Sequence, residues 1–312
     1  MRVVSLIASA TEMLCALDCE DMLVARSHEC DWPAGVTRLP QASRPSFATK
    51  GGSRAIDLAV KDRLAKALSI YEVDAELLKR LKPDVILTQT QCQVCAVTPG
   101  DVERAVCELA DHPVRIIALE PNRLGDVWED IRRVAEALGV PGQGEALIAR
   151  LRRRVLGIGV RAAKLEKPRV AAIEWIDPLM AAGNWMPELI ELAGGTPVFG
   201  EAGKHSPWME WDDLTTEDPN VLLISPCGFG IARTMEELPL LQKREGWNAL
   251  EAVQANRAYV VDGNAYFHRP GPRLVESLEI LAEILHPDTF QFGREGAGWV
   301  RVVRPDVRTA GK

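Results

Sequence analysis

The sequence predicts an α/β protein with two parallel-sheet lobes joined by one long helix and a ligand cleft between the lobes. Three observations predict this fold. A chain of 312 residues exceeds the size at which one hydrophobic core usually keeps growing. Short apolar runs alternate with helical stretches in both halves, which is the pattern of parallel sheets covered by helices. A charged segment with helical periodicity, residues 143–165, lies between the halves.

This pattern divides the chain into four parts. They are an N-terminal α/β lobe (1–122), a connecting helical segment (123–167), a C-terminal α/β lobe (168–288) and a C-terminal tail (289–312). Phe290, Phe292 and Trp299 indicate that the tail packs on the body, whereas residues 304–312 have the character of a frayed end.

Each lobe contains several runs that we expect to form strands. In the first lobe they are residues 2–7, 22–25, 85–88 and 115–119, and in the second they are residues 170–175, 221–225 and 258–262. The two lobes also share a phrase, because Glu76 and Asp212 each lie seven positions before a proline that introduces a buried strand. This repetition favours two versions of one architecture.

The connecting segment has the pattern of a long amphipathic helix. Apolar side chains recur at steps of three and four residues, at Leu147, Leu151, Val155, Ile158, Ala162 and Leu165. Pro141-Gly142 before the segment and Pro168 after it are expected to mark its ends. The arginines near position 152 fall largely on other sides, and we interpret them as a solvated face. The alternative is an ordinary surface helix of a single domain.

Composition limits the classes of partner and the compartment. A net charge of −7 argues against nucleic acid or anionic lipid as the main partner, since either favours a basic face. No apolar run is long enough for membrane insertion. Seven cysteines, an odd number, fit a reducing compartment, and Met1 leads directly into a strand without a signal-peptide pattern. We therefore expect a cytoplasmic protein, with a periplasmic protein whose leader was removed as the alternative.

Polar side chains gather after the first two predicted strands. Ser9 or Thr11 is the expected N-cap of the helix that follows the first strand. The second strand runs into His28, Glu29 and Cys30, residue types that a simple turn does not need. In open parallel sheets, ligands bind outside the carboxyl ends of the strands. We therefore interpret this cluster as part of a ligand site.

Thiols follow the predicted strands in a similar way. Cys30, Cys92, Cys95 and Cys227 each come shortly after a strand. If the strands are parallel, these cysteines converge in the cleft and form one metal site, with zinc or an iron–sulfur cluster as occupant. Cys92-Gln-Val-Cys95 alone has too few ligands for this purpose, and the remaining thiols must come from distant segments.

Aromatic and basic residues of the second lobe complete the expected site. Trp175, Trp185, Phe229 and Tyr266 follow strands or open helices, where aromatic side chains serve as core caps or as walls of a ligand pocket. His268 follows the last strand of this lobe. Arg269 and Arg273 are placed to meet polar edges of a ligand, or else to brace a loop next to Pro270-Gly-Pro272.

Several segments resemble the cobalamin and ferric-siderophore substrate-binding proteins of ABC importers, over residues 2–286. They are Ser5-Leu-Ile-Ala-Ser-Ala-Thr-Glu, Leu77-Leu-Lys-Arg-Leu-Lys-Pro-Asp-Val-Ile, Glu188-Leu-Ile-Glu-Leu-Ala-Gly-Gly and Gly271-Pro-Arg-Leu-Val-Glu. Within that family, the chain is similar to a leaderless, cysteine-containing branch usually labelled cobalamin-binding. The matching segments are His28-Glu-Cys-Asp-Trp-Pro, Cys92-Gln-Val-Cys and Pro226-Cys-Gly-Phe.

The resemblance implies a class III substrate-binding fold and a non-enzymatic protein that holds a corrinoid, such as cobalamin, or another metal-bearing small molecule. It also implies that Glu76 and Asp212 dock on arginines of an ABC permease. The alternative is a cytoplasmic protein that binds zinc or an iron–sulfur cluster through its cysteines. An enzyme is the least favoured class, because the sequence has neither a Gly-x-Ser-x-Gly elbow nor a phosphate-binding P-loop.

Overall fold

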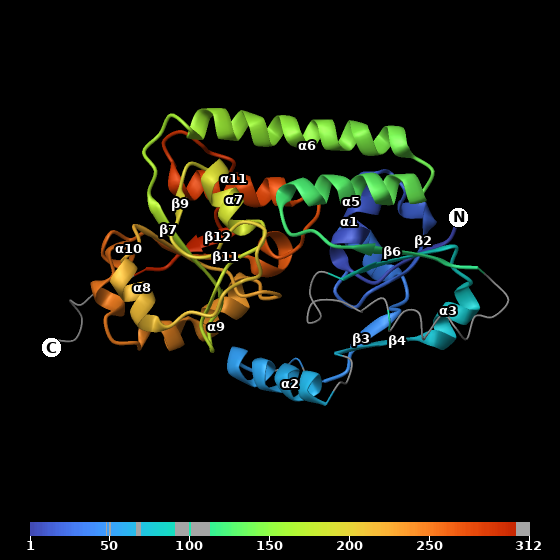
Figure 1. Cartoon of the computed structure of the whole chain (residues 1–312), viewed down its shortest axis with the longest axis horizontal. Helices are drawn as coiled ribbons and strands as arrows, with labels where there is room; N and C mark the ends of the chain where they lie inside the picture. Colours follow the sequence, from blue (N-terminus) through green and yellow to red (C-terminus); the bar gives the residue numbers. More distant parts are fainter. Residues whose placement is uncertain (48, 50, 67–69, 91–99, 101–112, 304–312) are drawn as a thin grey trace. The chain divides into compact units, whose positions relative to one another are not determined.

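The computed structural model describes residues 1–47, 49, 51–66, 70–90, 100 and 113–303. The chain forms two compact units (Figure 1). The first contains Met1–Arg154 together with the short segment Arg269–Arg273, and the second contains Val155–His268 and the chain from Leu274 onward. None of the helices in the described part of the chain combines the length and the apolar character needed to span a bilayer.

The first unit is built on a parallel sheet with the strand order β2-β1-β5-β6. Its strands are β1 (Val3–Ser5), β2 (Leu23–Arg26), β5 (Val85–Gln89) and β6 (Arg115–Leu119), and its helices before the connecting helix include α1 (Ala8–Ala16), α2 (Ser53–Ala65), α3 (Ala75–Leu81) and α5 (Leu124–Ala137). Short 3₁₀ turns span Glu20–Met22 and Ala34–Arg38, and an antiparallel pair joins β3 (Ser43–Pro45) to β4 (Tyr71–Val73). Val4, Ala25 and Ile86 pack with Leu77 and Leu78 of α3 into one core cluster.

The second unit has a sheet with the order β12-β11-β10-β7-β8, and β9 pairs with β7. The strands are β7 (Arg169–Trp175), β8 (Met180–Ala181), β9 (Thr196–Pro197), β10 (Val221–Ile224), β11 (Ala258–Val261) and β12 (Trp299–Arg301). The helices are α7 (Met186–Leu192), α8 (Trp211–Glu217), α9 (Ile231–Gln242), α10 (Glu251–Gln254) and α11 (Leu274–Leu285), with a 3₁₀ turn at Trp247–Ala249 and a π-helical turn at Gly263–Phe267. β7, β10 and β11 are parallel, while β8 and β12 are antiparallel edges.

The expected α/β fold with two parallel sheets is confirmed, and all seven predicted strands are present with ends shifted by at most two residues. Sequence reasoning missed the short strands β3, β4, β8, β9 and β12. The tail packs as expected, because Phe290 and Trp299 are buried and β12 pairs with β11. Two- and three-residue strands are too short to show an alternating pattern, which explains why they were missed.

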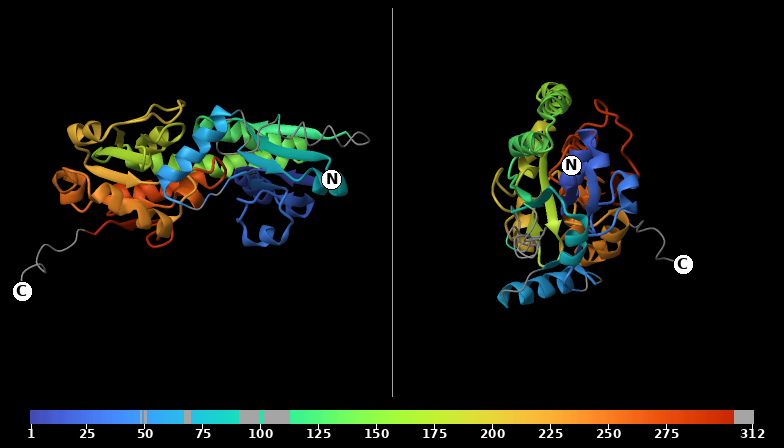
Figure 2. Two further views of the ribbon diagram at one scale, coloured as in Figure 1. Left: turned by 90° about the horizontal axis from the view of Figure 1, so that it is seen from below. Right: turned by 90° about the vertical axis from the view of Figure 1, so that its right-hand side faces the viewer.

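The connecting helix is α6 (Pro141–Ala162), one unbroken helix of 22 residues (Figures 1 and 2). The prediction placed Pro141 before the helix, but Pro141 is its first residue. A proline is favoured there because the first helical N–H has no partner within the helix. Leu147, Leu151 and Ile158 of the predicted stripe are buried.

The shared phrase of the two lobes corresponds to a shared structure. α3 and α8 each have seven residues and end at a left-handed residue, Lys82 with φ 45° and Asp218 with φ 39°. A proline follows in each case and leads into β5 or β10. Such a left-handed cap followed by proline ends a helix sharply. Glu76 and Asp212 are the second residues of these two helices, and both are exposed.

Candidate functional site

The N-cap expected for α1 is not formed. The helix starts at Ala8, directly after β1, and its N-cap is Ile7, which makes no side-chain hydrogen bond to the helix. Ser9 and Thr11 therefore fall inside the helix and are buried. Thr11 Oγ1 instead donates to Cys30 Sγ at 3.0 Å. The hydroxyl of Thr11 thus fixes the loop that follows β2.

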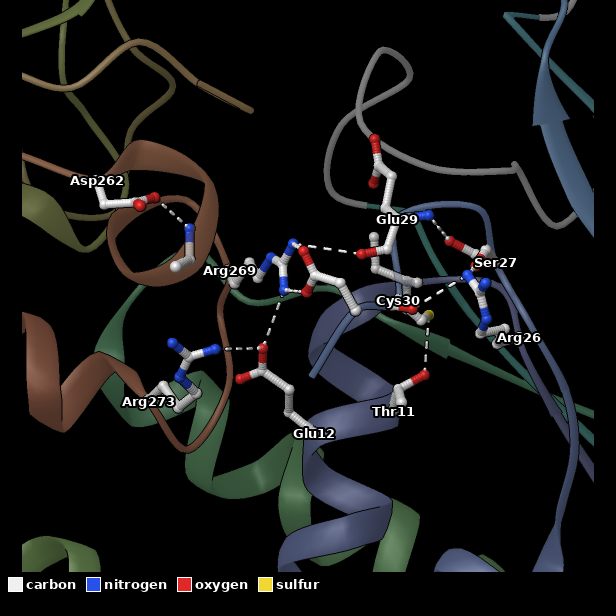
Figure 3. Close-up of polar contacts among 12 residues, drawn as sticks. Thr11, Glu12, Arg26, Ser27, Glu29, Cys30, Asp262, Arg269 and Arg273 are labelled. Atoms are coloured by element: carbon white, nitrogen blue, oxygen red, sulfur yellow. Dashed lines mark hydrogen bonds and ion pairs between the residues drawn. The ribbon is translucent and has the colours of Figure 1, made fainter. Parts of the chain in front are cut away.

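That loop, residues 27–32, is held from inside by Arg26, the last residue of β2 (Figure 3). The guanidinium of Arg26 is buried and donates to the carbonyl oxygens of Ser27 at 2.9 Å, Cys30 at 3.1 Å and Thr37 at 3.2 Å. Three bonds from one rigid fork determine the path of the loop, since an arginine has its donors in a fixed plane.

Arg269 holds the same loop from the other side, although it lies 238 positions after Asp31 in the sequence (Figure 3). Its Nη1 and Nη2 contact the two carboxylate oxygens of Asp31 at 2.5 and 3.1 Å, and Nη2 also donates to the carbonyl oxygen of Glu29 at 3.3 Å. Burial alone would lower the pKa of Arg269, but its hydrogen bonds to Asp31 raise it above the ordinary value. The guanidinium therefore stays charged.

Glu12 of α1 completes this ionic cluster. Its Oε1 lies 3.3 Å from Nη1 of both Arg269 and Arg273, and the side chain is almost fully buried. Burial raises the pKa of Glu12 to about 7, even though both arginines act to lower it. The guanidinium of Arg273 also lies 4.7 Å from the ring centre of Trp32, a cation–π contact.

These contacts give Arg269 and Arg273 a bracing role in the structure. We expected both to meet polar edges of a ligand, but both are mostly buried, and the contacts of Arg269 include Glu12, Asp31 and the carbonyl of Glu29. Of the two alternatives that the sequence left open, the loop brace is the one that the geometry favours. Direct contact with a ligand stays a prediction.

His28 and Glu29 belong to the same loop. Nδ1 of His28 is 3.2 Å from Ser43 Oγ, its ring centre is 5.3 Å from that of Tyr71, and Nε2 is 3.8 Å from a carboxylate oxygen of Glu29. Burial lowers the pKa of His28 to about 4. The imidazole is therefore neutral near pH 7, which is the form that binds a metal. The side chain of Glu29 is 41% exposed and points away from Arg269 (Figure 3).

The expected four-thiol site gains no support from its described members. Cys30 is 1% exposed, and its sulfur accepts a hydrogen bond from the hydroxyl of Thr11. Burial raises the pKa of this thiol, so Cys30 is a protonated thiol in the core. Cys227 is half-buried in the other unit. Cys92 and Cys95 lie outside the described residues. Among the described residues, no group of three or more His, Cys, Asp and Glu side chains is arranged to hold a metal ion.

In the second unit, a polar cluster forms at the carboxyl ends of β7 and β10. Nε2 of His268 lies 2.6 Å from the carbonyl oxygen of Ser225 and 3.3 Å from its Oγ, while Nδ1 lies 3.8 Å from Glu174. Ser206 Oγ donates to the same carboxylate at 2.8 Å. A carbonyl oxygen only accepts hydrogen bonds, so in its contact with the carbonyl of Ser225 the Nε2 of His268 is the donor and carries the proton. A protonated Nε2 cannot take a proton from the buried hydroxyl of Ser225. The cluster therefore fixes the turn at His268, and contact of His268 with a ligand stays a prediction.

Aromatic residues of this unit separate into exposed and buried members. Trp175 is half-buried, and its ring centre lies 5.3 Å from that of Phe229. The guanidinium of Arg233 lies 4.8 Å from the centre of the same Phe229 ring. Tyr266 is half-buried on the π-helical turn. Trp185 was expected to be a pocket wall, but it is 5% exposed and its Nε1 donates to the carbonyl oxygen of Phe267. Trp185 is therefore a core residue, and Phe229 supports Trp175 from below the surface.

The predicted site residues do not include two exposed tryptophans and one arginine. Trp32 is 51% exposed beside Arg273, Trp208 is 57% exposed, and Arg233 stacks on Phe229. Both tryptophans adjoin a proline in polar loops, which is a weak signal of an exposed ring. Nothing in the local sequence distinguishes Arg233 from other helical arginines.

Comparison with known proteins agrees with this fold. The profile of the family described as periplasmic binding protein matches residues 3–265. A vitamin B12-binding protein of Photorhabdus laumondii is 23% identical over 288 residues, 92% of this chain and 88% of the relative. An uncharacterized ABC transporter substrate-binding lipoprotein of Bacillus subtilis is 22% identical over 267 residues, 82% of this chain and 81% of the relative.

Solved structures show the same architecture. The periplasmic vitamin B12 binding protein of Vibrio cholerae superposes with a TM-score of 0.65 and 19% identity, over 93% of this chain and 98% of that chain. A periplasmic heme binding protein of Pseudomonas aeruginosa gives 0.69 and 20%, over 97% and 98%. These likenesses establish the class III fold of two α/β lobes with parallel sheets. Together with the family profile, they show that the chain belongs to the periplasmic binding protein family, whose members bind substrates and are not enzymes.

Proposed function

We propose that this protein is the substrate-binding component of an ABC importer and that its ligand is a corrinoid. Membership of the periplasmic binding protein family supports the general role. Several similar curated proteins are vitamin B12-binding proteins, which supports the choice of ligand. An import role requires the periplasmic alternative for the compartment, and cell fractionation tests that placement.

The observation that carries the proposal is the half-buried indole of Trp175 at the carboxyl end of β7. Phe229 lies under it, and the guanidinium of Arg233 lies against Phe229. The indole offers one flat apolar face, and the phenyl ring that supports it, tilted by 58°, has a cation against it; this arrangement suits a large ring that has polar groups at its rim. Strand ends in parallel sheets are where ligands bind, and Trp175 is the last residue of β7.

A heme is the second candidate, and His28 is the observation that favours it. Its imidazole is neutral, and Nδ1 lies beside Ser43, which leaves Nε2 as the nitrogen for a metal. The same nitrogen suits the cobalt of a corrinoid, and both ligands therefore belong in one experiment. Direct binding of zinc or an iron–sulfur cluster is not proposed, because Cys30 is a buried thiol.

Calorimetric titration with cyanocobalamin, dicyanocobinamide and hemin tests the proposal. We expect saturable binding of the two corrinoids, weakened by about 1–3 kcal/mol in Trp175→Ala, the range for loss of an aromatic stacking partner. Phe292→Ala is the control, since Phe292 is an exposed aromatic residue in the tail. Saturable binding of hemin alone would replace the corrinoid by a heme, and no heat with any of the three would exclude both ligands.

A further inference from the structure

The connecting helix α6 has an exposed apolar pair that its buried stripe does not explain. Leu156 and Val160 lie one helical turn apart and are 64% and 53% exposed. Leu151 and Ile158, by comparison, are 3% and 4% exposed. At about 100° per residue, Leu156 and Val160 point to the side opposite the buried stripe. The helix therefore has one apolar side in the core and a second apolar strip in solvent.

Cationic residues border this exposed strip. Arg152 and Arg153 are exposed, and on the helical wheel they lie on either side of Leu156 and Val160. Glu145, the one acidic residue of α6, lies on this side as well but is ion-paired with Arg132 at 2.5 Å, and residues 146–165 contain no Asp or Glu, although the whole chain has a net charge of −7. The acidic character of the protein therefore lies elsewhere, and this side of α6 is locally basic.

Aliphatic side chains among arginines on one helix side match the chemistry of an anionic lipid surface. The cations meet lipid phosphates, and the aliphatic groups enter the boundary between headgroups and acyl chains. We propose that the α6 outer face, defined as Arg152, Arg153, Leu156 and Val160, binds the surface of an anionic phospholipid membrane. The inference does not depend on the ligand of the protein, and it concerns peripheral contact without insertion of a helix.

Charge complementarity sets the size of the expected effects. Each basic residue near an anionic membrane strengthens binding about fivefold. The negative charges elsewhere on the chain weaken this attraction little, because the screening length is about 10 Å at 0.1 M salt. Binding is therefore expected to fall steeply as salt is added. Nucleic acid fits the face less well, since its phosphates would engage the arginines and leave Leu156 and Val160 in solvent.

Co-sedimentation of the full chain with vesicles tests the proposal. The vesicles are equimolar phosphatidylglycerol and phosphatidylcholine, or phosphatidylcholine alone. We expect binding to the anionic vesicles only, weakened at least about 25-fold in Arg152→Glu/Arg153→Glu, and weakened severalfold in Leu156→Ser/Val160→Ser. Lys79→Glu/Arg80→Glu is the matched control, because it makes the same charge change at exposed positions of α3. Circular dichroism shows whether each variant is folded.

Three outcomes would overturn the proposal. The first is no binding of the folded wild-type protein to anionic vesicles at low salt. The second is an equal loss in the α3 control pair, which would mean that net charge alone decides the binding. The third is a combination of two results. Leu156→Ser/Val160→Ser binds vesicles as the wild type does, and Arg152→Glu/Arg153→Glu loses binding to DNA or to an acidic protein as well as to vesicles. In that case the face is a general polyanion site.

Discussion

The imidazole of His28 lies beside Ser43 and Tyr71, and burial lowers its pKa to about 4 from an ordinary value of 6.5. Between these values the unfolded chain binds a proton that the folded protein does not. The contribution of His28 to stability is thus complete above pH 6.5 and is lost as the pH falls toward 4. The slope is at most about 1.4 kcal/mol per pH unit.

We therefore expect His28→Gln to flatten the pH dependence of the free energy of unfolding between pH 6.5 and 4. Urea unfolding at several pH values measures it. His205→Gln is the control, because His205 is exposed. Parallel pH profiles for the wild type and His28→Gln would show that the ring is not buried as the structure has it.

Arg269 is a loop brace in this structure, and a ligand contact was the alternative. Arg269→Gln leaves the buried carboxylate of Glu12 with Arg273 alone and removes Arg269 from the half-exposed Asp31. We expect a loss of about 1–3 kcal/mol in the free energy of unfolding, the range for buried polar groups that lose one hydrogen-bond partner. Arg80→Gln, at an exposed position of α3, is expected to change stability by less than about 0.5 kcal/mol. Unchanged stability with lost ligand affinity would instead assign Arg269 to the ligand.

At the scale of elements, the caps of α3 and α8 are the repeated device. Lys82 ends α3 in a left-handed conformation with φ 45°, which is unfavourable for a residue with a Cβ by about 1 kcal/mol. Lys82→Gly is therefore expected to raise the thermal midpoint or leave it unchanged. Lys79→Gly, inside the same helix, is expected to destabilise by about 1 kcal/mol. Destabilisation of similar size in both variants would contradict the assigned cap.

The sequence was sufficient for the main elements, because each has a local signal. The seven predicted strands, the connecting helix and the repeated phrase around Glu76 and Asp212 depend on periodicity or on proline within a short window. The site depends on contacts that no window contains. Arg269 meets Glu12 across 257 positions, and the burial of Trp185 depends on a carbonyl 82 positions away.

The thiol hypothesis shows the same limit. Placing Cys30 after a strand was correct, but the direction of its side chain depends on Thr11 of the neighbouring helix. A parallel sheet brings strand ends to one edge, yet a residue four positions beyond a strand can point into the core as easily as outward. Position in sequence therefore indicated the region of the site and not its members.

For the whole molecule, the importer role makes a separate prediction about Glu76 and Asp212. Both are exposed at the second position of equivalent helices. We expect Glu76→Lys/Asp212→Lys to abolish ligand uptake by cells that contain the importer while leaving ligand affinity unchanged, since rim charges govern docking.

Glu136→Lys/Glu166→Lys is the control for this pair. It makes the same reversals at an exposed glutamate of each unit. Uptake that is equally reduced in both double variants would point to an effect of net charge, and full uptake with Glu76→Lys/Asp212→Lys would remove these residues from the partner surface.

The visible absorption spectrum of the protein tests corrinoid binding. The protein is incubated with cyanocobalamin and freed of unbound ligand by gel filtration, with Trp175→Ala treated in parallel. We expect the wild-type protein to retain the corrinoid bands in stoichiometric amount and Trp175→Ala to retain clearly less. A colourless wild-type protein, when the folded state has been verified by circular dichroism, would contradict it.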